Sequence, residues 1–264
     1  MKRKFMDWAV VTAAAVLAAL GPARADLSWE TKGQAFLTIG GGETVVQSSK
    51  SSFSLKQNVV RIDEAEVNGA RFINFQNQTG VIVSFEERTF TVWPLTELIA
   101  MERNSEEELK QDLPNREITL TTMQGEEKEI YAAQIEAQKI IFDLWSKPYQ
   151  VRATTERGEV LGHQCVKYEG LSGDKVFQEI WVAEDIVLDP FYKTYFAPGM
   201  GRFDPQEYGH LPLVPGFPMK VINRYGLVRV VTEVTHVTDS LIPAEAFTLP
   251  EDLIESPLVN RPPQ

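Results

Sequence analysis

The stretch VLGHQCVKYEG, residues 160–170, carries the single cysteine of the chain, Cys165, and one of its three histidines, His163. A nucleophilic thiol needs a base within hydrogen-bond reach and a third group that orients the base. Residues two apart on a strand point the same way in parallel, so these two side chains do not converge on one substrate atom. Lys167 could lower the pKa of the thiol, but there is no Cys-x-x-Cys pair. We predict that Cys165 is a small buried apolar residue, with a Cys–His enzyme as the alternative.

The sequence also offers little for a metal site or for other common catalytic chemistry. A structural zinc site needs four ligands, usually in paired spacings, and the other two histidines, His210 and His236, stand apart. The segment DPQEYGH brings Asp204, Glu207 and His210 close together, but the calcium-loop spacing and the Gly-x-Ser-x-Gly elbow are missing. We therefore predict no metal, no cofactor, no catalytic residue and no enzymatic activity.

The N-terminus has the three parts of a secretory signal peptide. A basic start, MKRK, precedes the apolar run AVVTAAAVLAAL at residues 9–20, and Ala23-Arg24-Ala25 follows before Asp26. The apolar run is shorter than the roughly 20 residues of a membrane span. We predict a signal peptide at residues 1–25, cleavage between Ala25 and Asp26, and a periplasmic protein. A short retained anchor is the alternative.

The charge of the chain argues against some partners. Its formal net charge is −11. Cleavage would remove four basic residues and one acidic residue, a net charge of +3, and leave −14. Such a chain repels phosphate backbones, so we expect no nucleic-acid partner. Acidity of this kind commonly keeps a secreted protein soluble, and an acidic docking site is the alternative.

The pattern of turn residues and apolar residues predicts a strand-rich chain with two helices inserted midway. Gly40-Gly41-Gly42 indicates a hairpin turn, because no Lys-Ser/Thr and no helix follow as a phosphate loop requires. Helices are expected at 95–113, ended by Pro114, and at 126–145, ended by Pro148. Strands are expected at 28–39, 44–55, 58–64, 71–76, 79–86, 88–93, 116–123, 150–156, 159–169, 174–183 and 220–237.

Short connections between these strands indicate an antiparallel sheet, in a mainly β chain of the α+β class. No linker breaks residues 26–250, so we predict one domain there and a Pro-rich C-terminal tail at 251–264. On the strand at 159–169 we place Leu161, His163 and Cys165 on one face. Apolar residues on both faces of the later strands indicate a sheet covered on both sides, although a thick ordinary core would give the same pattern.

Residues 186–219 differ from the rest of the chain. They are rich in proline, glycine and aromatic residues, and loops of this length are often functional. Such a loop could cover an apolar cavity, or it could pack its own aromatic side chains on the sheet edge. Its aromatic residues are Phe191, Tyr192, Tyr195, Phe196, Phe203, Tyr208 and Phe217.

Several motifs together resemble an uncharacterised family of secreted bacterial domains. Gly162, Cys165 and Tyr168 fit a Gly-x-x-Cys-x-x-Tyr strand, and FQEIWVAEDI at 177–186 resembles the strand that follows it. The segments VVRIDEAEVNGARFI, VSFEERTFTVWPL, GFPMKV and IPAEAFTLPEDL are similar as well, so the resemblance covers most of the mature chain. This family is related in fold to the outer-membrane lipoprotein carriers of the LolA/LolB type.

The resemblance implies a single antiparallel, unclosed β-barrel, or half-barrel, with helices packed on its concave face. In the carriers that face takes the acyl chains of lipids or lipoproteins. No cargo-handling residue maps onto this sequence. No lipidation cysteine follows the cleavage site, and residues 186–219 are longer than the minimal fold requires.

These observations lead to two functional hypotheses. The first is a soluble periplasmic carrier that binds an amphipathic ligand, a lipid, acyl chain or lipoprotein, in an apolar concavity. The second is an envelope module that binds another protein and has a filled core. A cavity of roughly 300 Å³ or more would favour the carrier. The candidate lining or gate residues are Trp93, Trp181, Phe191, Tyr192, Tyr195, Phe196, Phe203 and Phe217.

Overall fold

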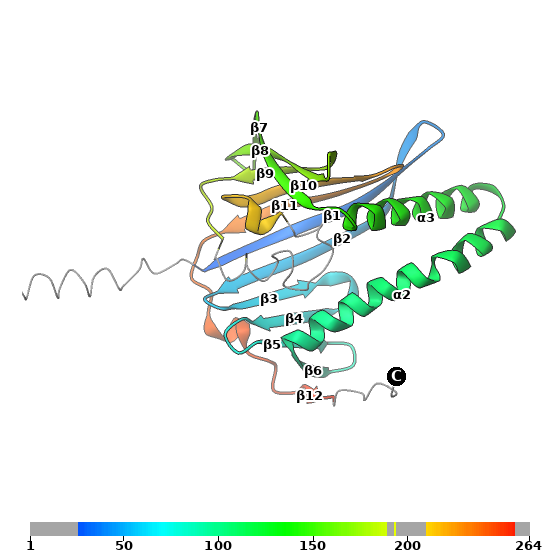
Figure 1. The fold of residues 1–264 in the computed structure, drawn as a ribbon. Helices are drawn as coiled ribbons and strands as arrows, with labels where there is room; N and C mark the ends of the chain where they lie inside the picture. The colour runs from blue at the N-terminus through cyan, green and yellow to red at the C-terminus, as the bar shows by residue number, and fades with distance from the viewer. Residues whose placement is uncertain (1–25, 189–192, 194–209, 257–264) are drawn as a thin grey trace, which may run out of the picture.

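The computed structural model describes residues 26–188, 193 and 210–256, and within them the chain is mainly β (Figure 1). Twelve strands form one sheet in the order β12-β6-β5-β4-β3-β2-β1-β11-β10-β9-β8-β7. Strands β7 and β12 stand at opposite ends of this order, so the sheet is not closed, in agreement with the expected unclosed architecture. All pairings are antiparallel except that of β12 with β6.

In the described residues, six strands precede the two long helices and six follow them. The strands before the helices are β1 (Leu27–Ile39), β2 (Gly42–Lys56), β3 (Val59–Glu64), β4 (Gly69–Asn74), β5 (Thr79–Ser84) and β6 (Thr89–Pro94). The helices are α2 (Leu95–Thr122) and α3 (Gly125–Trp145), with short 3-10 turns η1 (Ala65–Val67), η2 (Leu211–Leu213) and η3 (Ala244–Phe247). The later strands are β7 (Tyr149–Val160), β8 (His163–Ser172), β9 (Lys175–Ala183), β10 (Phe217–Tyr225), β11 (Val228–Thr238) and β12 (Ile254–Glu255).

The N-terminal hairpin forms where the glycines predict it. Ile39 pairs with Gly42, and the two residues between them, Gly40 and Gly41, have φ of 62° and 82°. Two successive positive φ angles match the right-handed twist of the flanking strands, and glycine adopts them without steric cost. This confirms the hairpin and leaves no phosphate loop at these residues.

The prediction that Pro114 ends the first helix is wrong. Helix α2 continues through Pro114 to Thr122. The strand predicted at 116–123 is therefore helical up to Thr122, and Met123 is the C-cap residue. Proline removes one backbone donor from a helix interior, but helix packing can offset that loss. Here the segment after Pro114 lies against α3, where Arg116 donates to Gln138 at 2.7 Å and Lys139 pairs with Glu117 at 2.6 Å.

Two strand boundaries also differ from the prediction. The turn between β7 and β8 lies at Leu161-Gly162, both with positive φ, so Leu161 does not share a strand face with His163 and Cys165. Gly158, in the gap between the predicted strands at 150–156 and 159–169, lies inside β7, where a Cβ would come within 2.7 Å of the Trp181 ring. The predicted single strand at 220–237 is β10 and β11, separated by a turn at Gly226, whose φ is 66°.

Both sides of the sheet carry apolar packing. Neighbouring residues on β4 fall into different clusters: Ile73 joins the main core, and Phe72 joins a cluster with Leu249 and Leu253 from the C-terminal segment. Helix α3 contributes Ala137 and Leu144 to a third cluster with strand residues. The sheet is therefore covered on both faces, as the sequence indicated.

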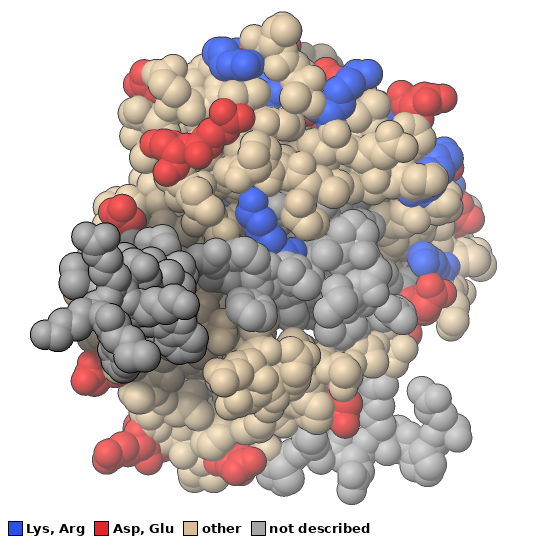
Figure 2. Space-filling model, turned by 60° about the vertical axis from the view of Figure 1, so that its left-hand side comes forward, with Lys and Arg blue, Asp and Glu red and all other residues tan. Residues whose placement is uncertain are grey.

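The C-terminal segment forms an edge strand of the sheet. β12 adds a parallel edge strand, pairing Ile254 with Thr89, so Ile254 and Glu255 of the predicted tail belong to the sheet. On the face in Figure 2, the visible Asp and Glu side chains stand in several separate groups.

Candidate ligand-binding pocket

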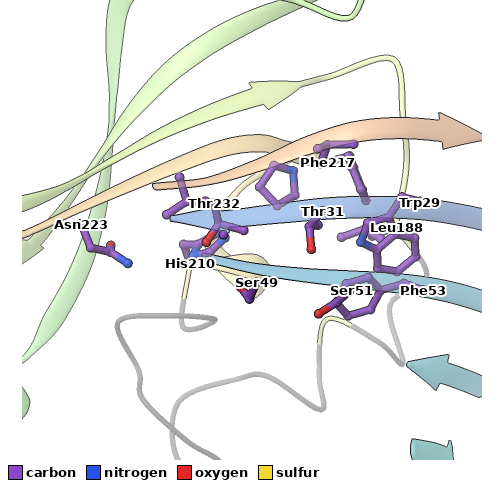
Figure 3. A pocket seen from close by; sticks show the side chains of 14 residues that line it. Trp29, Thr31, Ser49, Ser51, Phe53, Leu188, His210, Phe217, Asn223 and Thr232 are labelled. Carbon is purple, nitrogen blue, oxygen red and sulfur yellow. The ribbon is translucent and has the colours of Figure 1, made fainter. Parts of the chain in front are cut away.

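A pocket of about 130 Å³ lies on the side of the sheet that carries the main core (Figure 3). Its floor comes from four neighbouring strands, β2, β1, β11 and β10. Alternate residues of β1 face it, and each is in register with a β2 residue that also faces it. These pairs are Trp29 with Phe53, Thr31 with Ser51, and Gly33 with Ser49.

One end of the pocket is aromatic. The rings of Trp29 and Phe53 are stacked, with centroids 4.8 Å apart and planes 2° apart. Phe217 meets Trp29 edge-on, at 5.4 Å and 80°. Leu188, almost fully buried, lines the same end (Figure 3). An apolar group placed here would contact three rings and lose its contact with water.

The other end is polar. Asn223 and Thr232 line it together with Ser49 and His210 (Figure 3). The Asn223 side-chain oxygen accepts a hydrogen bond from Gln178 at 2.8 Å, and the Tyr149 hydroxyl donates to Gln178 at 2.6 Å. This buried relay fixes the orientation of the Asn223 amide. The pocket thus runs from an aromatic end to a polar end.

His210 is the most unusual lining residue. Its side chain is 2% exposed, and neither ring nitrogen has a hydrogen-bond partner in the part of the chain that the structure describes. Its backbone is fixed, because its carbonyl accepts hydrogen bonds from Leu213 and Val214 at 2.9 and 3.1 Å. Burial lowers the pKa of His210 to about 3, so the ring is neutral at pH 7.

Of the predicted ligand contacts that the structure describes, one lines the pocket and two do not. Phe217 lines the pocket, whereas Trp93 and Trp181 pack at the margin of the main core and do not line it. The other five, Phe191, Tyr192, Tyr195, Phe196 and Phe203, lie outside the described residues. Their role as a gate stays a prediction.

The sequence did not identify Trp29, Phe53 or His210 as pocket residues. The spacing of Leu27, Trp29 and Thr31 predicts that they share one face of a strand, but it does not predict which face is buried. The sequence offers His210 only as a possible metal ligand beside Asp204 and Glu207, which lie outside the described residues. In the described segments, no three His, Cys, Asp or Glu side chains gather as a metal site.

The His163 ring is not hydrogen-bonded to the Cys165 thiol, so it is not placed to activate it. Cys165 is 1% exposed, and its thiol donates to the His163 backbone carbonyl at 3.5 Å. The His163 ring instead pairs with Asp185, with Nδ1 and Oδ2 2.8 Å apart. Burial raises the pKa of the Cys165 thiol, which disfavours the thiolate. The predicted burial of Cys165 is confirmed.

At the N-terminal end of the described chain, Asp26 is buried. Its carboxylate pairs with Lys56 at 2.9 Å and accepts a hydrogen bond from the Ile242 amide at 2.9 Å. Ala25, on the other side of the predicted cleavage site, lies outside the described residues. Of the helices in the described segments, none is long and apolar enough to cross a membrane.

Comparisons with known proteins identify a family and distant structural matches. A family model described as domain of unknown function DUF4412 matches residues 96–253. No curated protein matches the sequence. The solved structure of PNGF-II is similar at 12% identity and a TM-score of 0.35, covering 88% of this chain and 32% of that one, so the chain spans about a third of PNGF-II.

Two further solved structures have similar length. A LolA superfamily protein from Nitrosomonas europaea is 8% identical with a TM-score of 0.32, covering 87% of this chain and 92% of that one. A protein from Vibrio parahaemolyticus, described as a putative outer membrane lipoprotein-sorting protein domain, is 7% identical with a TM-score of 0.28, covering 89% and 94%.

Proposed function

The chain belongs to the family described as domain of unknown function DUF4412, and we propose that it is a non-enzymatic binding protein for an amphipathic ligand. The ligand is a lipid, an acyl chain or the acyl chain of a lipoprotein. It occupies the pocket over β1, β2, β10 and β11. The observation that carries this proposal is the change of the pocket wall from aromatic to polar along its length.

The aromatic end suits an alkyl group. Trp29, Phe53 and Phe217 present three rings, and Leu188 adds an aliphatic side chain. Removing alkyl surface from water contributes about 0.8 kcal/mol per CH₂. The hydroxyl and amide groups at the opposite end suit a headgroup, because they can replace the hydrogen bonds that it loses with water.

The helices fit this proposal. We place the pocket on the concave side of an unclosed barrel, with α3 packed on the same side. Ala137 and Leu144 of α3 share a cluster with Phe177 and Tyr225 of the sheet. The helix would then close one end of the concave face and leave the pocket near the middle of the sheet.

The site of action follows from the N-terminus. We propose that residues 1–25 are a signal peptide cleaved between Ala25 and Asp26 and that the mature protein acts in the periplasm. Its partners would be lipids or acylated proteins of the envelope, and the net charge, −11 for the full chain and −14 after cleavage, disfavours nucleic acid.

The size of the pocket favours a second candidate. Its volume of about 130 Å³ is well below the roughly 300–1,000 Å³ of common ligand pockets. A site this small takes a short apolar group rather than a whole acyl chain unless it widens. An envelope interaction module with a filled core is the alternative, and exposed Val45 and Val46 on β2 would be available to a protein partner.

Native mass spectrometry combined with lipid extraction separates the two candidates. The full chain, exported to a bacterial periplasm and purified without detergent, should carry stoichiometric lipid or acylated peptide. Ser51→Leu should fill the pocket and abolish that binding, because Ser51 faces the pocket. Ser52→Leu is the matched control, since its exposed side chain points to the opposite side of β2.

A chain free of lipid that also refuses added fatty acids, monoacylglycerols and phospholipids would overturn the binding proposal and favour the interaction module. Equal loss in the Ser51→Leu and Ser52→Leu variants would place the binding site elsewhere. Circular dichroism of both variants ensures that the comparison is made between folded proteins.

A further inference from the structure

Resting on the proposed function, we infer that the pocket selects an uncharged amphiphile whose headgroup carries a hydroxyl, and that His210 is the residue that recognises it. A monoacylglycerol has this chemistry. Such a ligand would lie in the pocket between Trp29, His210 and Phe217.

The buried ring of His210 is the main evidence for such a ligand. A buried imidazole without hydrogen bonds is costly, because both nitrogens lose water and gain nothing. No described residue satisfies either nitrogen of His210, although the ring lines a pocket. A neutral imidazole presents one donor and one acceptor. A hydroxyl is the smallest group that can act as both acceptor and donor, and two neighbouring hydroxyls could engage both nitrogens.

The composition of the pocket wall also favours an uncharged ligand. Every described side chain that lines the pocket is uncharged at pH 7, and six of them carry neutral groups that can donate or accept hydrogen bonds. These are Thr31, Ser49, Ser51, His210, Asn223 and Thr232. A phosphate or carboxylate headgroup needs Lys, Arg or several backbone amides to offset its desolvation. The described wall offers no cation for that purpose.

The nearby cations are directed elsewhere. Lys193, in the segment between Leu188 and His210, donates to the carbonyls of Val214 and Pro215 at 2.8 and 3.3 Å. Lys220 pairs with Glu233 at 3.2 Å. Lys220 on β10 and Glu233 on β11 alternate with residues that line the pocket, so their side chains lie on the opposite side of the sheet.

A fatty acid is the competing occupant. Its carboxylate could bind if His210 took up a proton and formed an ion pair in the pocket. Burial opposes that protonation, since His210 lies in a fully desolvated position. The uncharged ligand requires no buried charge and is therefore the one that the wall favours.

The test compares three ligands of equal chain length: a monoacylglycerol, a fatty acid and a lysophosphatidic acid. Their dissociation constants are measured at pH 7.5 by titration calorimetry below the critical micelle concentration. We expect the monoacylglycerol to bind at least tenfold more tightly than either anion. His210→Leu should remove that preference, while the matched variant His236→Leu, at an exposed position of β11, should keep it.

His210→Gln provides a second variant, because its amide retains a donor and an acceptor and should keep part of the preference. Anions that bind as tightly as the monoacylglycerol, or an unchanged preference in a folded His210→Leu protein, would overturn the inference while leaving the binding function intact. If none of the three ligands binds the unaltered chain, this inference fails, and the proposed function fails with it only if the purified chain also carries no lipid or acylated peptide.

Discussion

Trp29 on β1 and Phe53 on β2 stack face to face across neighbouring strands, with centroids 4.8 Å apart and planes 2° apart. The two residues are in register in an antiparallel pair, so the stack follows from the strand pairing itself. Both rings are buried, and they join the sheet core to the aromatic end of the pocket. The pocket wall therefore also contributes to stability.

Phe53→Ala should reduce the free energy of unfolding by about 3–5 kcal/mol, the usual cost of truncating a buried phenylalanine. The loss combines the transfer of apolar surface with a cavity under the Trp29 ring. Urea unfolding followed by circular dichroism measures it. Val46→Ala, at an exposed position of the same strand, should change stability by less than about 0.5 kcal/mol. Similar values for the two variants would contradict the core role of Phe53.

His210 should make stability depend on pH. Its pKa is lowered to about 3 in the folded chain, against roughly 6.5 in an unfolded one. Between these values the unfolded state binds the extra proton, so stability falls as the pH is lowered from about 6.5 toward 3. The full difference corresponds to about 5 kcal/mol, at 1.36 kcal/mol per pKa unit.

The measurement is the free energy of unfolding of the unaltered chain and of His210→Leu from pH 4 to pH 7.5. His210→Leu should flatten the curve and raise stability at pH 7 by about 1–3 kcal/mol, since a polar group without a partner is removed. His236→Leu, at an exposed position of β11, is the control for replacing a histidine by leucine. Parallel curves for the unaltered chain and His210→Leu would show that His210 is solvated or paired.

Some of the fold could be predicted from the sequence because local chemistry decides it. The positive φ angles at Gly40 and Gly41 favour glycine, and the strands from β1 to β6 follow from alternation and turn residues. Helix α3 follows from its apolar stripe, with Ala137 and Leu144 on the buried side. These features need no information from distant parts of the chain.

The pocket could not be predicted in this way, because its wall joins residues far apart in sequence. Trp29 meets Phe217 only after β1 pairs with β11, which in turn pairs with β10. The burial of His210 likewise depends on where the segment before β10 lies on the sheet. Neither relationship leaves a periodic pattern in the sequence.

Cys165 should be unreactive in the folded protein. It is 1% exposed, and burial raises the pKa of its thiol. Ellman's reagent should therefore react slowly under native conditions and label one equivalent in guanidinium chloride. Rapid native labelling at pH 7 would contradict the burial and reopen the thiol as a reactive group.

Pro114→Ala should stabilise helix α2. Proline in a helix interior costs about 3 kcal/mol relative to alanine, and Pro114 is exposed, so its removal sacrifices little packing. The new amide can donate to the carbonyl one turn earlier, at Lys110. Thermal unfolding should show a higher midpoint than for Asn115→Ala, a neighbouring exposed substitution. A lower midpoint would mean that the proline sets a bend that the contact with α3 requires.

Asp26 should matter for stability although it begins the described chain. Its buried carboxylate binds Lys56 and the Ile242 amide, and Lys56 also donates to the Ile242 carbonyl. Asp26→Ala would leave the Lys56 ammonium and the buried amide without this acceptor, at a cost of about 3 kcal/mol. Urea unfolding measures the loss, with Asp239→Ala, an exposed carboxylate beside the same strand end, as control. A loss below about 0.5 kcal/mol for Asp26→Ala would show that this group of contacts does not anchor the start of β1.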